Sequence, residues 1–134
     1  MSVIRHETFA LQADSDVVRA RQMVRDWAIQ IGFSLVDQTK VVTAASELAR
    51  NLLQYGNGGT MHLEALNDDV RRGLRLTFED QGPGIHDLEM AMRDGYTTGG
   101  GLGLGLGGAK RLSSEFNVDS RPGEGTRIVI IRWK

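Results

Sequence analysis

The chain has 134 residues, a formal net charge of −1 at pH 7 and no cysteine, with 40% hydrophobic and 25% charged residues, as is typical of a soluble globular protein. The length suits one domain over residues 1–134, and the lack of cysteine excludes disulfides, thiolate metal sites and a cysteine nucleophile. The low net charge gives no global field for nucleic acid or anionic membrane, and without a signal peptide or a membrane-length apolar run we expect a cytoplasmic protein.

The N-terminal part of the chain predicts a strand followed by a helix. Residues 3–11 alternate loosely between apolar and polar side chains, and a helix is expected over residues 16–31, capped by Asp14 or Ser15. Gly32 is expected to end this helix. Its apolar residues recur at helical spacing and predict one buried stripe: Val17, Ala20, Val24, Trp27 and Ile31. The arginines opposite the stripe predict a solvated face, with a partner surface as the alternative.

A longer helix is predicted over residues 34–55, with Ser34 as its N-cap and Asp37 supporting its first turn. Glu47 and Asn51 are four residues apart, so they stack on one face of this helix, with roughly 6 Å between their Cβ atoms. That face borders the buried stripe, and we therefore expect both polar side chains to be partly enclosed. The stripe itself consists of Val41, Ala45, Leu48 and Leu52.

The middle of the chain predicts a β-hairpin. Residues 60–66 and 73–79 alternate as strands do, and the polar residues 67–69 form the turn between them. The second strand runs directly into the sequence Asp80-Gln81-Gly82-Pro83-Gly84. A carboxylate at a strand end, followed by two glycines around a proline, predicts a tight bend that leaves Asp80 to be covered by a ligand.

A glycine-rich run occupies residues 97–108. Such a run is not expected inside a helix or strand, because glycine loses much backbone freedom there. It leads into a helix expected over residues 104–116, and a glycine loop before a helix is typical of a phosphate site, with a flexible linker as the alternative. Residues 95–101 are a candidate lid. Two final strands are expected at residues 117–120 and 126–133.

Common nucleotide motifs do not account for this run. Gly103, Gly105 and Gly108 match the dinucleotide pattern, but that pattern belongs after the first strand of a βαβ unit. A P-loop would need Gly-Lys-Ser/Thr, whereas Lys110 stands between alanine and arginine. The His-Arg-Asp and Asp-Phe-Gly triplets of protein kinases are also missing.

Residues 47–51, 80–84 and 99–108, in that order, resemble the motifs of the Bergerat ATP-binding fold that gyrase, Hsp90, histidine kinases and MutL share. Gly125-Thr126 is similar to the Gly-Thr pair that closes the adenine end of that pocket. The resemblance spans about residues 34–133. It implies an α+β fold, a two-layer sandwich in which a mixed, mainly antiparallel sheet carries helices on one face.

Within this superfamily, residues 46–51 and 79–85 look very like the RsbT-type serine/threonine kinases of the stressosome, which are related to the anti-sigma-factor serine kinases. The resemblance implies an ATP-dependent kinase that phosphorylates a STAS-domain protein. It also implies a partner switch in a stress-response or sigma-factor pathway, with a PP2C-type phosphatase as second partner. The alternatives are an anti-sigma factor that binds a sigma subunit and a non-catalytic, ATP-gated module. Glu47 argues against the module, because nucleotide binding alone needs no base there.

The resemblance assigns roles to single residues. Glu47 is the expected catalytic residue, which orients the substrate hydroxyl and accepts its proton. Asn51 supplies an oxygen ligand to Mg²⁺, which bridges the ATP phosphates. Asp80 accepts a hydrogen bond from the adenine 6-amino group and thereby selects ATP over GTP. The remaining expected contacts to the nucleotide are Gly82, Gly84 (which lets the base approach), Gly101, Leu102, Gly103, Gly105 and Thr126.

The expected docking surface surrounds the pocket mouth. It comprises residues 93–101, Arg50, Lys110 and Arg111, with Arg50 pointing away from Glu47 and Lys110 on a helix surface. The related sporulation kinases carry an arginine in the lid, whereas residues 97–100 here are Thr-Thr-Gly-Gly. We therefore expect slow turnover or turnover that needs a partner.

Overall fold

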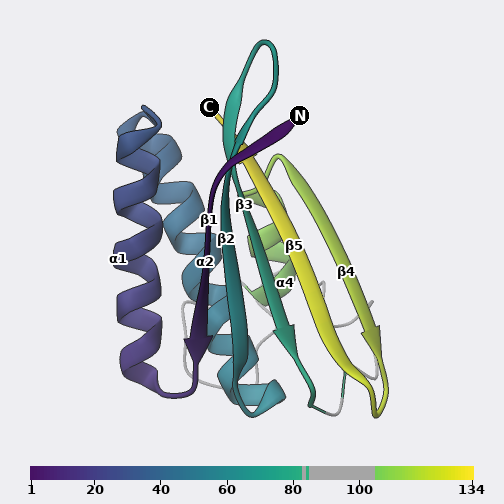
Figure 1. Ribbon diagram of the computed structural model, residues 1–134. Coiled ribbons are helices and arrows are strands. Elements are labelled where there is room, and N and C mark those ends of the chain that lie inside the picture. Colours follow the sequence, from purple (N-terminus) through teal and green to yellow (C-terminus); the bar gives the residue numbers. More distant parts are fainter. Residues whose placement is uncertain (83, 85–104) are drawn as a thin grey trace.

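A computed structural model describes residues 1–82, 84 and 105–134 (Figure 1). The predicted lid and most of the glycine-rich run lie outside these residues. The elements in chain order are β1 (Ser2–Leu11), α1 (Asp14–Gln30), α2 (Leu35–Gly56), β2 (Gly59–Asn67), β3 (Arg72–Asp80), α4 (Gly105–Arg111), β4 (Glu115–Arg121) and β5 (Gly125–Trp133).

The strands form one sheet in the order β1-β2-β3-β5-β4. All four pairings of this sheet are antiparallel, so the described strands lack the parallel component that a mixed sheet would have. Helices α1, α2 and α4 lie on one side of the sheet (Figure 1). The predicted α+β sandwich with helices on one face is therefore confirmed.

The core lies between this sheet face and the helices. Cross-strand partners such as Leu63 and Leu76, or Phe78 and Ile128, are buried because alternate side chains of each strand point to one face. The predicted helix stripes face them. Every member of both stripes is buried except Ile31, which packs against the core while partly exposed.

The ends of α1 and α2 agree with the expected signals except at one cap. Ser34 Oγ accepts a hydrogen bond of 3.1 Å from the backbone N–H of Asp37, as expected of an N-cap. The N-cap of α1 is Ala13, so the expected cap at Asp14 or Ser15 was wrong. Instead, the Asp16 carboxylate accepts hydrogen bonds from the backbone N–H groups of Gln12 and Ala13, and the helix begins at Asp14, two residues earlier than expected.

Helix α4 ends at Arg111, earlier than the expected end at residue 116. The reason is strand pairing, because the backbone N–H of Ser114 bonds to the carbonyl of Ile131 and Phe116 pairs with Ile130. In the part of the chain that the structure describes, no helix is both long and apolar enough to cross a membrane.

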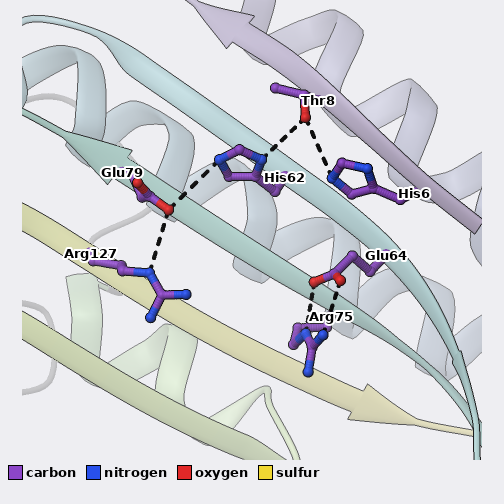
Figure 2. A network of polar contacts seen from close by, with 7 residues as sticks. All are labelled: His6, Thr8, His62, Glu64, Arg75, Glu79 and Arg127. Carbon is purple, nitrogen blue, oxygen red and sulfur yellow. Dashed lines mark hydrogen bonds and ion pairs between the residues drawn. The ribbon is translucent and has the colours of Figure 1, made fainter. Parts of the chain in front are cut away.

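The sheet face away from the helices is polar at its centre (Figure 2). Arg75 of β3 donates two hydrogen bonds, of 2.7 and 2.9 Å, to the Glu64 carboxylate of β2. Glu79 lies 3.4 Å from the Arg127 guanidinium and 3.7 Å from His62. These pairs tie neighbouring strands together on the side that no described helix covers.

Candidate functional site

The two polar side chains predicted on one face of α2 are enclosed, as expected. The Glu47 side chain is only 6% exposed, and Asn51, one turn further along, is half-buried. Both belong to a helix whose neighbouring side chains, Leu48 and Leu52, are in the core. A carboxylate at such a position needs a polar partner, because burial without one is costly.

That partner is Arg50. Its Nη2 donates a hydrogen bond of 2.6 Å to Glu47 Oε1. The expectation that Arg50 points away from Glu47 was therefore wrong. Residues three apart on a helix are neighbours on its surface, so the guanidinium reaches the buried carboxylate while the Arg50 side chain as a whole stays 34% exposed.

Asp80 lies at the C-terminal end of β3, against the last turn of α2. Its Oδ1 accepts a hydrogen bond of 2.9 Å from the backbone N–H of Gly82, which fixes the orientation of the carboxylate. A Cβ added to Gly56, the final residue of α2, would collide with the Asp80 carboxyl group. Residue 56 must therefore lack a side chain for Asp80 to lie where it does.

Gly56 was missed as a site residue. Its signal in the sequence is a glycine directly after the helix predicted over residues 34–55, a position where glycine commonly ends a helix and therefore indicates no ligand. Gly82 continues the same contact, since a Cβ there would lie 2.7 Å from the Gly56 Cα. The end of α2 and the bend after β3 thus touch backbone to backbone.

Two further glycines allow close backbone packing next to Asp80. Gly84 has a φ of +79° and Gly125 a φ of +101°, in the left-handed region that favours glycine. A Cβ at Gly84 would collide with the carbonyl of Arg121, and one at Gly125 with the carbonyl of Asp80. The structure therefore supplies a packing reason for Gly84 in addition to its expected role beside the base.

Thr126 stands opposite Asp80 in the pairing of β3 with β5. Its hydroxyl lies 2.8 Å from Ser120 Oγ of β4. A hollow of about 160 Å³ beside these residues is lined by Asp80, Arg121 and Thr126 among others. Because pockets for small ligands measure roughly 300–1,000 Å³, we assign no ligand to this hollow.

The remaining predicted residues divide into two groups. Gly105 begins α4, which packs on α2, and Lys110 is exposed on the surface of α4, as expected. Gly101, Leu102 and Gly103 lie outside the described residues. Among the residues that the structure does describe, no three histidine or acidic side chains come together as a metal cluster.

These positions follow one another along α2. Glu47 and Gly56 are nine residues apart, which corresponds to roughly 13 Å along the helix axis. Glu47 and Asn51, four residues apart, share one face of the helix, and Asp80 contacts its C-terminal end at Gly56. The helix thus has one carboxylate beside an amide in its middle and a second carboxylate at its end.

Comparison with known proteins gives this geometry a context. The family model described as "Histidine kinase-, DNA gyrase B-, and HSP90-like ATPase" matches residues 36–134. The serine/threonine-protein kinase RsbT of Bacillus subtilis (strain 168) is 47% identical over 123 residues, which cover 92% of each chain. An anti-sigma F factor of Thermoanaerobacter sp. (strain X514) is 28% identical over 119 residues, covering 85% of this chain and 82% of the relative.

Solved structures with low sequence identity share the fold. The RsbU and RsbW domains of a Mycobacterium tuberculosis protein match with a TM-score of 0.68 at 20% identity. That match covers 97% of this chain and 33% of the other. In the SiaB–SiaC complex from Pseudomonas aeruginosa, a chain matches with a TM-score of 0.56 at 14% identity, over 98% of this chain and 91% of the other.

Proposed function

The chain belongs to the histidine kinase-, DNA gyrase B- and HSP90-like ATPase family, and we propose that it transfers the γ-phosphoryl group of ATP to a serine or threonine of a STAS-domain protein. It is an ATP-dependent serine/threonine protein kinase of the RsbT type, at 47% identity over 92% of its length. The observation that carries the proposal is the pair of enclosed polar side chains on α2, the buried Glu47 and the half-buried Asn51, on a helix whose end contacts Asp80.

Asp80 and Asn51 offer groups that suit ATP. The Asp80 carboxylate, held by the Gly82 amide, offers an acceptor to the adenine amino group. Asn51 offers an amide oxygen to Mg²⁺, which commonly binds through one or two protein ligands and the substrate phosphates. Gly101, Leu102, Gly103 and Gly105 are proposed phosphate contacts on the strength of the glycine-rich motif, and Thr126 is proposed at the adenine end. Residues 1–134 are proposed to act as one domain.

Glu47 is the proposed base. The bound nucleotide supplies the phosphoryl group and ADP as the leaving group. Glu47 holds the substrate hydroxyl in line and accepts its proton while the hydroxyl oxygen bonds to the γ-phosphorus and the bond from that phosphorus to the bridging oxygen breaks. A buried carboxylate suits this task because little water competes for it.

Phosphorylation is proposed to switch partners. A STAS domain would dock on the surface of residues 93–101, Arg50, Lys110 and Arg111 and present its hydroxyl to Glu47. Transfer adds a charge of about −1.5 to −2 to that residue, which then faces the Glu47 carboxylate. The like charges repel, the complex loosens, and the same surface becomes free for a PP2C-type phosphatase.

The second candidate is an anti-sigma factor that binds and inhibits a sigma subunit. Its support is the similarity to anti-sigma F factors, such as the one from Clostridium kluyveri (strain NBRC 12016) at 30% identity over 83% of this chain. The two functions differ in what accepts the phosphoryl group and what the protein binds.

Transfer of labelled phosphate from γ-labelled ATP separates them. The chain is incubated with Mg²⁺ and either a STAS-domain protein or a sigma factor, with a chelator as control. We expect label on the STAS protein only, and none with the chelator. Unlabelled STAS protein together with stable sigma-factor binding would overturn the proposal in favour of the second candidate.

Competition binding tests the switch itself. We expect the STAS protein to bind more tightly than its Ser→Asp form and to be displaced by the N-terminal region of the phosphatase. Equal affinities, or simultaneous binding of both partners, would exclude a switch on a shared surface.

A further inference from the structure

The ion pair between Arg50 and Glu47 has a consequence for the reaction. Its Nη2–Oε1 distance of 2.6 Å is that of a charge-assisted hydrogen bond, and such bonds are stronger than neutral ones. The carboxylate is 6% exposed and the guanidinium 34%. These are exposures of the whole side chains, so Arg50 is the more accessible member of the pair although its Nε is buried.

The hydrogen bond from Arg50 occupies Oε1 of the Glu47 carboxylate. A hydroxyl that approaches that oxygen competes with the guanidinium for it. The Arg50 Nε, which is buried, has no hydrogen-bond partner among the described residues. A guanidinium with a buried, unpartnered Nε gains from keeping its bond to Glu47, so Arg50 holds the carboxylate until a competing partner enters.

We propose that Arg50 restrains Glu47 and that release of this ion pair is a step of the phosphoryl transfer. The inference rests on the proposed role of Glu47 as the base. Arg50 is a positioning residue here, since it acts on the reacting hydroxyl only through Glu47. The restraint keeps transfer slow until a substrate hydroxyl displaces the guanidinium.

The simpler explanation of the ion pair is that Arg50 only neutralises the buried charge of Glu47. The two explanations predict opposite changes in rate. If Arg50 only neutralises, its removal destabilises the fold and leaves kcat unchanged or lowered. If Arg50 restrains the base, its removal raises kcat even while the fold loses some stability.

The experiment measures kcat and the KM for ATP of phosphoryl transfer to the STAS-domain protein. For Arg50→Met, which keeps the aliphatic stem, we expect kcat to rise about tenfold, with an unchanged KM for ATP. Arg50→Lys keeps a cation for Glu47 and is expected to restore most of the restraint. Arg75→Met is the matched control, since it breaks the similarly close pair with Glu64 on the far sheet face.

The double variant Glu47→Gln/Arg50→Met decides whether Arg50 acts through Glu47. We expect it to be as slow as Glu47→Gln alone. An increase in kcat that survives in the double variant, an unchanged or lowered kcat in Arg50→Met, or an equal increase in Arg75→Met would overturn the inference. If Arg50→Met does not fold, Arg50→Gln is measured in its place against the same outcomes.

Failure of the proposed function gives a different result, because the wild-type chain then leaves the STAS-domain protein unlabelled. Failure of the proposed role of Glu47 is distinct again, because Glu47→Gln then transfers phosphate at the normal rate. If Glu47→Gln is inactive and Arg50→Met shows no increase in kcat, the restraint by Arg50 is refuted while the proposed function stands.

Discussion

At the scale of single residues, the site depends on two carboxylates in different settings. Glu47 is buried and paired with Arg50, whereas Asp80 is half-buried and held by a backbone amide. A carboxylate that accepts a backbone N–H keeps a fixed orientation, which suits recognition of a ligand donor. A buried carboxylate beside a removable partner suits proton transfer.

Replacing Asp80 with asparagine is expected to weaken ATP binding. The change removes the charge from the acceptor proposed for the adenine amino group, and a hydrogen bond to a charged group contributes on the order of 1.5–3 kcal/mol. Calorimetry with Mg²⁺-ATP measures the loss. Asp119→Asn is the control, because that side chain is 70% exposed on β4. Unchanged ATP affinity in Asp80→Asn would refute the adenine assignment.

Replacing Glu47 with glutamine is expected to spare ATP affinity and to slow phosphoryl transfer about 10²–10⁴-fold, the usual effect of losing a general base. Asn51→Ala is the companion variant. It should lower both turnover and the Mg²⁺-dependent part of ATP affinity, because the proposed metal ligand is gone. Calorimetry and the labelled-phosphate assay distinguish the two patterns. Normal transfer by Glu47→Gln would contradict the role of the base.

At the scale of elements, the site is the meeting point of the end of α2 with the end of β3. The close approach depends on Gly56, whose missing side chain leaves room for the Asp80 carboxyl group. Asn57, which follows Gly56, adopts a left-handed φ of 61° and ends the helix there. Helix α2 thus carries Glu47 and Asn51 in its middle turns, and its last residue packs against Asp80.

Gly56→Ala is expected to destabilise the fold by about 1–3 kcal/mol, the usual cost of overpacking, and to weaken ATP binding. The added methyl group forces Asp80 away from the end of α2. Gln54→Ala, on the exposed side of the same helical turn, is the control and should change neither quantity much. Urea denaturation gives the stability and calorimetry the affinity. An alanine at residue 56 that leaves both intact would mean that Asp80 is not held by this contact.

At the scale of the whole molecule, ion pairs connect elements that are far apart in the sequence. Arg132 of β5 donates a hydrogen bond of 2.6 Å to Asp37 in the first turn of α2, and Arg75 of β3 holds Glu64 of β2. The hydrogen bond from Arg132 lowers the pKa of Asp37, and the hydrogen bonds from Arg75 lower the pKa of Glu64. These carboxylates stabilise the fold only while they are ionised.

Stability is therefore expected to fall in acid. A group whose pKa is lowered in the folded state contributes its full stabilisation above the unfolded value and loses it as the pH drops through the folded value. For Glu64 the loss begins below its ordinary pKa of 4.5, and for Asp37 below 3.8. Urea denaturation across this range measures the effect. Glu64→Gln should flatten the dependence, and an unchanged pH profile in that variant would exclude a contribution from the pair.

The described helices and strands and the fold class were predictable from the sequence, apart from the cap of α1, the end of α4 and the expected mixed sheet. Hydrophobic periodicity predicted the buried stripes of α1 and α2 and the β-hairpin. Apolar residues recur with the period of the helix or strand when one of its faces is buried. The order of the motifs around Glu47, Asp80 and the glycine-rich run identified the family, because each motif is local. Ser34 was predictable as a cap for the same reason, since its partner Asp37 is three residues away.

Contacts between residues that are distant in the sequence depend on the tertiary structure. Asp80 and Gly56 contact each other although they are 24 positions apart in the sequence. Arg132 likewise bonds to Asp37, and Gly125 packs against the Asp80 carbonyl. None of these contacts produces a periodic pattern in the sequence. The Arg50 side chain was misplaced because spacing fixes a residue on a helix face but not the rotamer of a long, flexible side chain. That rotamer is selected by the need of the buried Glu47 charge for a partner, and this need exists only once the fold has buried it.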